Sequence, residues 1–183
     1  MKRLDLLVTL IVIVGFFSVT RCHHPVPSAA MVEIIPGVVA EADKEEMHQI
    51  VAAFDRAESA VQKGDLVALM AFYSTAYNYH GLKLADVRRV WDEVFTHYGE
   101  VNSRHVFTEL KLTQTGRVRK AYVTCTGGLF GTGRQTGKPV TIDSWTNEVH
   151  FLVKEEGVWR FLGNKGGPVP SAPPASAPHH PLF

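Results

Sequence analysis

The sequence has few cysteines, little net charge and no long apolar run. It contains 2 cysteines in 183 residues, which excludes a disulfide-rich fold. The formal net charge is +1 and the Lys and Arg residues are scattered, so we expect no nucleic-acid partner. A hydrophobic content of 45% and a charged content of 20% are typical of a globular domain. The length predicts one domain with extensions.

The sequence also lacks the short motifs that mark common chemistries. It has no nucleophile elbow, no phosphate-binding loop and no paired metal-ligand motif. Two histidine pairs, His23-His24 and His179-His180, have no companion ligands at a fixed spacing. The sequence therefore predicts no metal site and no cofactor.

The N-terminus has the features of an export signal. Lys2 and Arg3 precede an apolar run at 6–17, which is shorter than the roughly 20 residues of a membrane-spanning helix. We expect residues 1–22 to be a signal peptide or membrane anchor and the protein to be exported to the periplasm, cell surface or medium. Cys22 stands where a bacterial lipoprotein has its lipidated cysteine, although Arg21 departs from that motif. Lipid attachment at Cys22, ordinary export and an uncleaved anchor tether all remain open.

The rest of the chain divides into a linker, a domain and a tail. Residues 23–42 are rich in Pro, Ala and Val without periodicity, which predicts a linker. Residues 166–183 are rich in proline, which predicts an extended, disordered tail. The folded domain is therefore expected at 43–165. Cys125 lies in a predicted strand and is interpreted as a small buried residue.

Apolar spacing predicts helices in the first half of the domain. Asp43 with Glu46 has the spacing of a capping box, and Gly64 ends the first helix. Asp65 caps a short second helix that extends to about Tyr73. A third helix at 84–98 has a regular apolar face made of Leu84, Val87, Val90, Trp91, Val94, Phe95 and Tyr98.

Alternation predicts strands in the second half, after a short strand around Tyr77 and Tyr79. One strand has Val106, Thr108, Leu110 and Leu112 on one face, and the next covers 121–129. A hairpin at 141–163 turns at 155–157. Alternate residues of a strand share one face, so Val149, Phe151 and Val153 are predicted to lie on the core face. The same alternation places the upstream residues Asp143, Trp145 and Asn147 on that face. A face that begins polar and ends apolar indicates a sheet that lines a pocket at one end.

Helices followed by antiparallel strands predict an α+β domain with the helices on one face of a bent sheet. The stretch GDLVALMAFYSTAYNYHG at 64–81, the Trp/Phe-rich helix and the hairpin at 141–163 resemble the nuclear-transport-factor-2-like superfamily over 46–163. The similarity is to its SnoaL-like, ketosteroid-isomerase-like branch. The resemblance implies a cone-shaped fold, with three N-terminal helices packed on a strongly curved, mainly antiparallel sheet. It also implies a pocket at the open end and homodimers formed through the sheet.

The resemblance does not choose a reaction, because the superfamily includes isomerases, dehydratases, cyclases and non-catalytic domains. The isomerase mechanism takes its carboxylate base from the segment after the second helix. Here residues 74–80 contain no Asp or Glu, and His80 is the only conventional base. A lyase or isomerase in which His80 and Asp143, together with His105, act on a small apolar carbonyl compound is the alternative hypothesis.

The favoured hypothesis is non-catalytic binding of a small apolar or amphipathic molecule, or a dimeric interaction module. The candidate ligand-binding residues combine aromatic walls with a few polar groups, which is what such a molecule needs. They are Tyr77, Tyr79, His105, Trp145 and Asn147. The same side chains also suit ordinary structural roles: core aromatics, and polar residues at strand ends.

Overall fold

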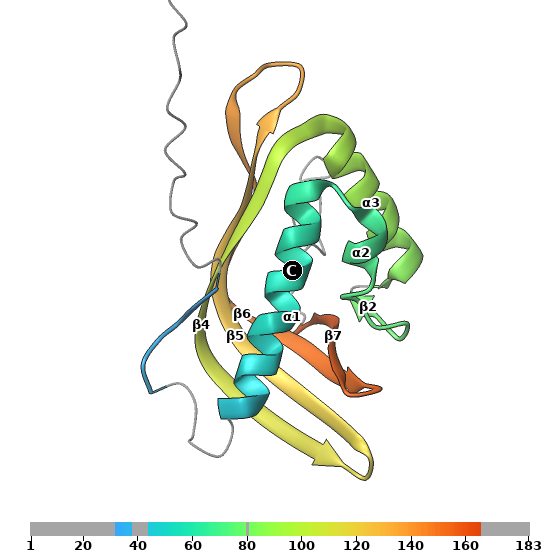
Figure 1. Cartoon of the computed structure of the whole chain (residues 1–183), viewed down its shortest axis with the longest axis vertical. Coiled ribbons are helices and arrows are strands. Elements are labelled where there is room, and N and C mark those ends of the chain that lie inside the picture. The colour runs from blue at the N-terminus through green and yellow to red at the C-terminus, as the bar shows by residue number, and fades with distance from the viewer. Residues whose placement is uncertain (1–31, 38–43, 80, 166–183) are drawn as a thin grey trace, which may run out of the picture.

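The computed structural model describes residues 32–37, 44–79 and 81–165. Figure 1 shows a strongly curved sheet with helix α1 (Lys44–Lys63) in its concavity and the helices α2 (Leu66–Met70) and α3 (Leu84–His97) beside it. The expected signal segment with Cys22, the expected tail and His80 lie outside the described residues. No helix within the described residues has the length and hydropathy needed to span a membrane.

The five-stranded sheet has the order β1-β4-β5-β6-β7. The strands β4 (Tyr98–Thr115), β5 (Val118–Gly133), β6 (Pro139–Glu155) and β7 (Val158–Asn164) pair antiparallel in sequence order. Strand β1 (Val32–Ile34) pairs parallel with β4 and was not expected, because it lies in the segment predicted as a linker. The strands β2 (Asn78–Tyr79) and β3 (Leu82–Lys83) form a separate small sheet. The α+β class and the mainly antiparallel sheet are confirmed.

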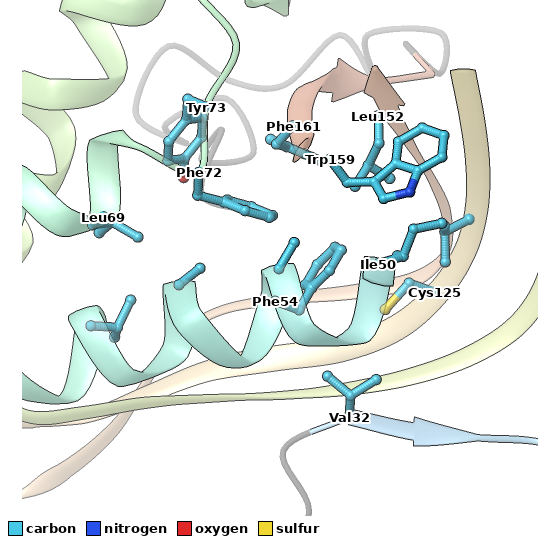
Figure 2. Close-up of a cluster of buried hydrophobic side chains, with 14 of the residues drawn as sticks. Val32, Ile50, Phe54, Leu69, Phe72, Tyr73, Cys125, Leu152, Trp159 and Phe161 are labelled. Carbon is cyan, nitrogen blue, oxygen red and sulfur yellow. The ribbon is translucent and has the colours of Figure 1, made fainter. Parts of the chain in front are cut away.

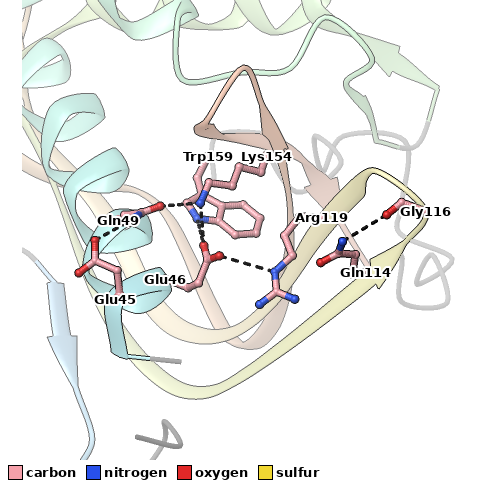
Figure 3. Close-up of polar contacts among 8 residues, drawn as sticks. All are labelled: Glu45, Glu46, Gln49, Gln114, Gly116, Arg119, Lys154 and Trp159. Atoms are coloured by element: carbon pink, nitrogen blue, oxygen red, sulfur yellow. Dashed lines mark hydrogen bonds and ion pairs between the residues drawn. The ribbon is translucent and has the colours of Figure 1, made fainter. Parts of the chain in front are cut away.

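Helix α1 buries its predicted apolar stripe against the sheet. Hydrogen bonds near its N-terminus also attach it to the sheet. Ile50, Phe54 and Val61 are each at most 1% exposed. Near its N-terminus, Glu46 accepts hydrogen bonds from Lys154 Nζ at 3.1 Å and Trp159 Nε1 at 3.0 Å (Figure 3). These bonds join the first turns of α1 to β6 and β7. Helix α3 also has the predicted extent to within one residue.

Helix α2 ends earlier than predicted, because the chain leaves it to pair with β7. The amide of Phe161 donates to the carbonyl of Phe72 at 2.7 Å, and the amide of Ser74 donates to the carbonyl of Phe161 at 2.8 Å. Figure 2 shows the aromatic core beside this junction, where Phe54 of α1 faces Phe72 with ring centroids 5.0 Å apart. Trp91 of α3 is buried in the same core, as predicted.

The predicted core face of β6 is wrong for Asn147, Val149 and Phe151, because a bulge interrupts the alternation. Between the pairs Cys125↔Glu148 and Gly127↔Trp145 the register shifts, and Asn147 takes a φ of 53°. Trp145 and Val153 are buried as expected, but beyond the bulge His150 and Leu152 are the fully buried residues, and Val149 and Phe151 are only half-buried.

Strand β4 shows the same effect. The register shifts between Phe107 and Glu109, so the buried face before the bulge carries Val101, Ser103, His105 and Phe107. Val106 and Thr108, predicted to share one face with Leu110 and Leu112, are half-buried and alternate with this buried face. In both strands a histidine, His105 in β4 and His150 in β6, therefore lies on the buried face. Simple alternation along β6 did not predict this polar interior.

Candidate functional site

Polar side chains from α1 and four strands gather between α1 and the concave face of the sheet. We call this group the interior polar cluster, and each member is at most 6% exposed. Its members are Glu58 of α1, Ser103 and His105 of β4, Cys125 of β5, Trp145 and His150 of β6, and Asn164 of β7. Burial of so many polar groups is costly unless they are hydrogen-bonded, so their partners define the site.

One chain of contacts runs from Glu58 to His105. The amide of Ser103 donates to both carboxylate oxygens of Glu58 at 3.1 Å, and Ser103 Oγ donates to Glu58 Oε2. His105 Nε2 lies 3.1 Å from Ser103 Oγ. Since the serine proton points to the carboxylate, we assign the proton of this contact to His105 Nε2. Burial raises the pKa of Glu58, and the Ser103 hydrogen bonds oppose that rise.

The other side of the His105 ring faces Cys125. His105 Nδ1 lies 3.6 Å from Cys125 Sγ, and Trp145 Nε1 donates to the same sulfur at 3.3 Å. Burial lowers the pKa of His105 well below its usual value. Burial also raises the pKa of the Cys125 thiol to about 12. The imidazole and the thiol are therefore both neutral at pH 7.

One ring nitrogen of His150 is hydrogen-bonded to Asn164, and the other has no hydrogen-bond partner among the described residues. His150 Nδ1 lies 2.7 Å from Asn164 Oδ1, which accepts its proton. His150 Nε2 is buried and has no hydrogen-bond partner among the described residues. Burial lowers the pKa of His150 to about 4, against the opposing effect of the Asn164 bond. At neutral pH this nitrogen therefore presents an unused lone pair.

Asn164 extends the network towards solvent. A hydrogen bond joins Asn164 to Tyr79, whose hydroxyl donates to Glu148 Oε1 at 3.2 Å. Burial, with the charge of Glu148, raises the pKa of the Tyr79 hydroxyl to about 12, and Asp143 contributes to the rise. Glu148 and Asp143 are half-buried, so this end of the network is reached from the surface.

The structure brings most of the predicted site residues together. Tyr77 and Tyr79 are buried at the Glu148 end, and His105 and Trp145 lie in the interior polar cluster. Asn147 does not join them: it is exposed, and its amide donates to Thr126 Oγ1 at 2.9 Å. Its predicted place on the core face is wrong because the bulge turns it outward. The His80–Asp143 pairing is not described, since His80 lies outside the described residues.

Sequence reasoning missed Glu58, Glu148, His150 and Asn164. A signal existed for Glu58, which lies in the α1 stripe four residues after Phe54 and three before Val61. A signal also existed for the two β6 residues. Asparagine tolerates positive φ better than most residues, so Asn147 inside an alternating strand indicated a bulge and a change of face.

Two surface grooves lie away from the predicted pocket near Trp145. One, of about 420 Å³, lies between α1, α2 and β7 and includes Ala57, Phe72 and Trp159 in its lining. The other, of about 330 Å³, lies beside the β5–β6 turn and includes Asn102 and Phe130. Neither groove is lined by a member of the interior polar cluster.

No protein-family model and no curated protein matches the sequence. Among solved structures, a proposed scytalone dehydratase from Novosphingobium aromaticivorans is similar with 10% identity and a TM-score of 0.52, over 70% of this chain and 89% of that one. A proposed dehydratase of the nuclear-transport-factor-2-like family from Streptomyces avermitilis has 16% identity and a TM-score of 0.48, over 66% and 94%. A ketosteroid isomerase-like protein from Erwinia carotovora has 23% identity and a TM-score of 0.46, over 64% and 92%. At these identities the likeness shows the fold alone, and the chain has the nuclear-transport-factor-2-like fold that its SnoaL-like resemblance implies.

Proposed function

We propose that this domain binds a small apolar or amphipathic molecule in the concavity of the sheet, with the polar end of the molecule at Tyr79, Glu148 and Asn164. The observation that carries the proposal is the continuous network from half-buried Glu148 through Tyr79 and Asn164 to His150. A network of this kind inside an aromatic shell offers both donors and acceptors to a ligand whose apolar part lies among rings.

The aromatic shell is dense around this network. The His105 ring lies 5.2 Å from the Trp145 ring, and the His150 ring lies 5.5 Å from the Phe161 ring. Tyr77 packs against Tyr73 with centroids 5.5 Å apart. Planar apolar molecules gain most from such surroundings, because ring contacts add to the free energy of burial.

Binding is favoured over catalysis by the state of the histidines. A general base works best when its pKa lies near the working pH, and burial moves His105 and His150 well below neutrality. The lyase or isomerase alternative therefore depends on His80 with Asp143. Its test is turnover of a β-hydroxy carbonyl compound that is lost in Asp143→Asn.

The proposal extends to the localisation and the oligomeric state of the protein. We propose an exported protein, tethered to a membrane if Cys22 is lipidated, that forms homodimers through the outer face of the sheet. Tyr122 and Phe151 lie half-buried on that face with ring centroids 5.1 Å apart, which gives a partner an aromatic contact surface. Light scattering of the wild type and of Phe151→Ser tests this. A monomeric wild type contradicts the dimer.

The binding proposal is tested by thermal-shift measurements with chelator present. The probes are progesterone, 2-naphthol and decanoic acid, which represent steroid-like, polyketide-like and fatty ligands. We expect at least one probe to raise the Tm of the wild type. Tyr79→Phe should weaken its affinity by about 5-fold, the effect of losing one hydrogen bond of about 1 kcal/mol. The exposed variant Asn147→Gly is the control and should bind as the wild type does. No stabilisation by any probe class contradicts the proposal.

A further inference from the structure

Three of the buried residues carry metal-ligating atoms that converge. His105, Cys125 and His150 come from the adjacent strands β4, β5 and β6, and one donor atom from each lies within 4.8 Å of the other two. All three residues are at most 2% exposed. No short sequence motif marks this group, because the sheet rather than a local turn assembles it.

The spacing is close to that of a tetrahedral metal centre. With a metal–sulfur bond of about 2.3 Å and a metal–nitrogen bond of about 2.0–2.1 Å, tetrahedral angles place the sulfur and nitrogen about 3.6 Å apart. His105 Nδ1 and Cys125 Sγ are 3.6 Å apart. The pair is thus separated as it would be across a bound ion, and a donor atom of His150 lies within 4.8 Å of both.

The hydrogen bonds orient the correct atoms towards this point. His150 gives its Nδ1 proton to Asn164 and keeps Nε2 without a partner among the described residues. His105 uses Nε2 for Ser103, which leaves Nδ1 facing the sulfur. A buried, unpartnered imidazole nitrogen is an independent sign of an absent ligand, because leaving it unpaired is costly.

The surrounding groups resemble the supporting shell of a metal site. In a metal-binding histidine, the N–H of the second ring nitrogen usually donates a hydrogen bond to a carboxylate, a carbonyl or another polar partner. Asn164 accepts this hydrogen bond from His150. Ser103 accepts it from His105, and Ser103 in turn donates to Glu58. Trp145 Nε1 donates to Cys125 Sγ, a contact that favours the charged thiolate needed for coordination.

We propose that His105 Nδ1, Cys125 Sγ and His150 Nε2 bind one transition-metal ion, zinc(II) or copper(I), inside the cone. A thiolate with two imidazoles is the donor set that these ions prefer. Coordination forms one metal–sulfur and two metal–nitrogen bonds and releases the Cys125 thiol proton to solvent, so one proton leaves for each ion bound. The proposal does not rest on binding of an organic molecule, since the ligating atoms are supplied by the protein alone.

The test is a titration of the full chain with cobalt(II), zinc(II) and copper(I), after purification without a histidine tag and stripping with chelator. We expect one cobalt ion per chain and a thiolate-to-cobalt charge-transfer band in the near ultraviolet. Cys125→Ser should abolish the band. His150→Gln should weaken zinc affinity by more than the roughly 10-fold to 100-fold that loss of a supporting residue such as Ser103 costs. Ser103→Ala should keep the band.

Matched controls separate this site from the other ligands of the chain. Cys22→Ser and a variant with His23, His24, His179 and His180 all changed to Ala should keep the band and the stoichiometry. A band that survives Cys125→Ser, or one that is lost in Cys22→Ser, overturns the proposal. So does the absence of stoichiometric binding of cobalt, zinc and copper(I) by the wild type. If Cys125→Ser does not fold by circular dichroism, Cys125→Ala and His150→Gln decide in the same way.

Failure of the metal site and failure of ligand binding are distinguishable. The thermal-shift measurements with progesterone, 2-naphthol and decanoic acid are made in chelator, and the metal titrations are made without these probes. Stabilisation by a probe without metal binding overturns only the metal proposal. Metal binding without stabilisation by any probe overturns only the proposed organic ligand.

Discussion

His150 Nδ1 lies 2.7 Å from Asn164 Oδ1, and this one contact orients the buried histidine. It places the proton on Nδ1 and leaves the opposite nitrogen as a lone pair within the concavity of the sheet. Asn164 also bonds Tyr79, so the same side chain links the ring to the surface end of the network.

Asn164→Ala should destabilise the fold, because it leaves the buried Nδ1–H of His150 without an acceptor. The expected loss of unfolding free energy is about 1–3 kcal/mol. Urea denaturation measures it. Asn78→Ala is the control, since Asn78 is exposed and its change should stay within about 0.5 kcal/mol. Equal stability of the two variants contradicts a structural role for the contact.

The protein should lose stability below pH 6.5 through His150. Its pKa is about 4 in the folded state, where burial disfavours the charged ring, against an ordinary value of 6.5. Between these values the unfolded state binds the proton and the folded state does not, so unfolding free energy falls as the pH falls. The contribution of His150 is about 3 kcal/mol across this window.

The measurement is chemical denaturation in chelator from pH 4 to pH 7, with the wild type and His150→Gln. The variant should show a shallower dependence on pH, since it cannot take up the proton. The exposed variant His48→Gln is the control and should follow the wild-type curve. A His150→Gln curve parallel to the wild type would show that the ring is not a neutral buried group.

Gly127→Ala should disturb the site through Trp145. A Cβ at this position would lie 2.1 Å from the carbonyl oxygen of Arg104 and 2.8 Å from Trp145 Cζ2. Neither neighbour has room, so we expect a loss of about 1–3 kcal/mol from overpacking and a weaker thermal shift with the probe that stabilises the wild type. Gly99→Ala is the matched control, because its Cβ would meet the Arg134 side chain at 3.6 Å and the Thr132 carbonyl oxygen at 4.0 Å, both ordinary contact distances.

Local patterns predicted the helices well. The stripes of α1 and α3 depend on neighbours three and four residues apart, and the structure buries Phe54 and Trp91 as those stripes require. The family resemblance added the curved sheet, which the structure confirms. Tyr77, Tyr79, His105 and Trp145, which were predicted to bind a ligand, are all buried, and their ligand-binding role stays a prediction.

The sequence could not supply the features that depend on register. The bulge at Asn147 reverses the faces of β6, and simple alternation therefore placed His150 on the wrong side. Strand β1 has only three residues and forms by pairing with β4, so it leaves no periodic pattern to find. The grouping of His105, Cys125 and His150 needs three strands in register, which no linear spacing encodes.

The most direct test of an interior ligand site follows the tryptophan indole N–H resonances by NMR during titration with the stabilising probe. Trp145 belongs to the interior polar cluster, whereas Trp159 lines the groove between α1, α2 and β7. With assignments from Trp145→Phe and Trp159→Phe, we expect the Trp145 signal to shift saturably while the Trp159 signal stays in place. A saturable shift of Trp159 alone, or no shift of either signal, would contradict an interior ligand site.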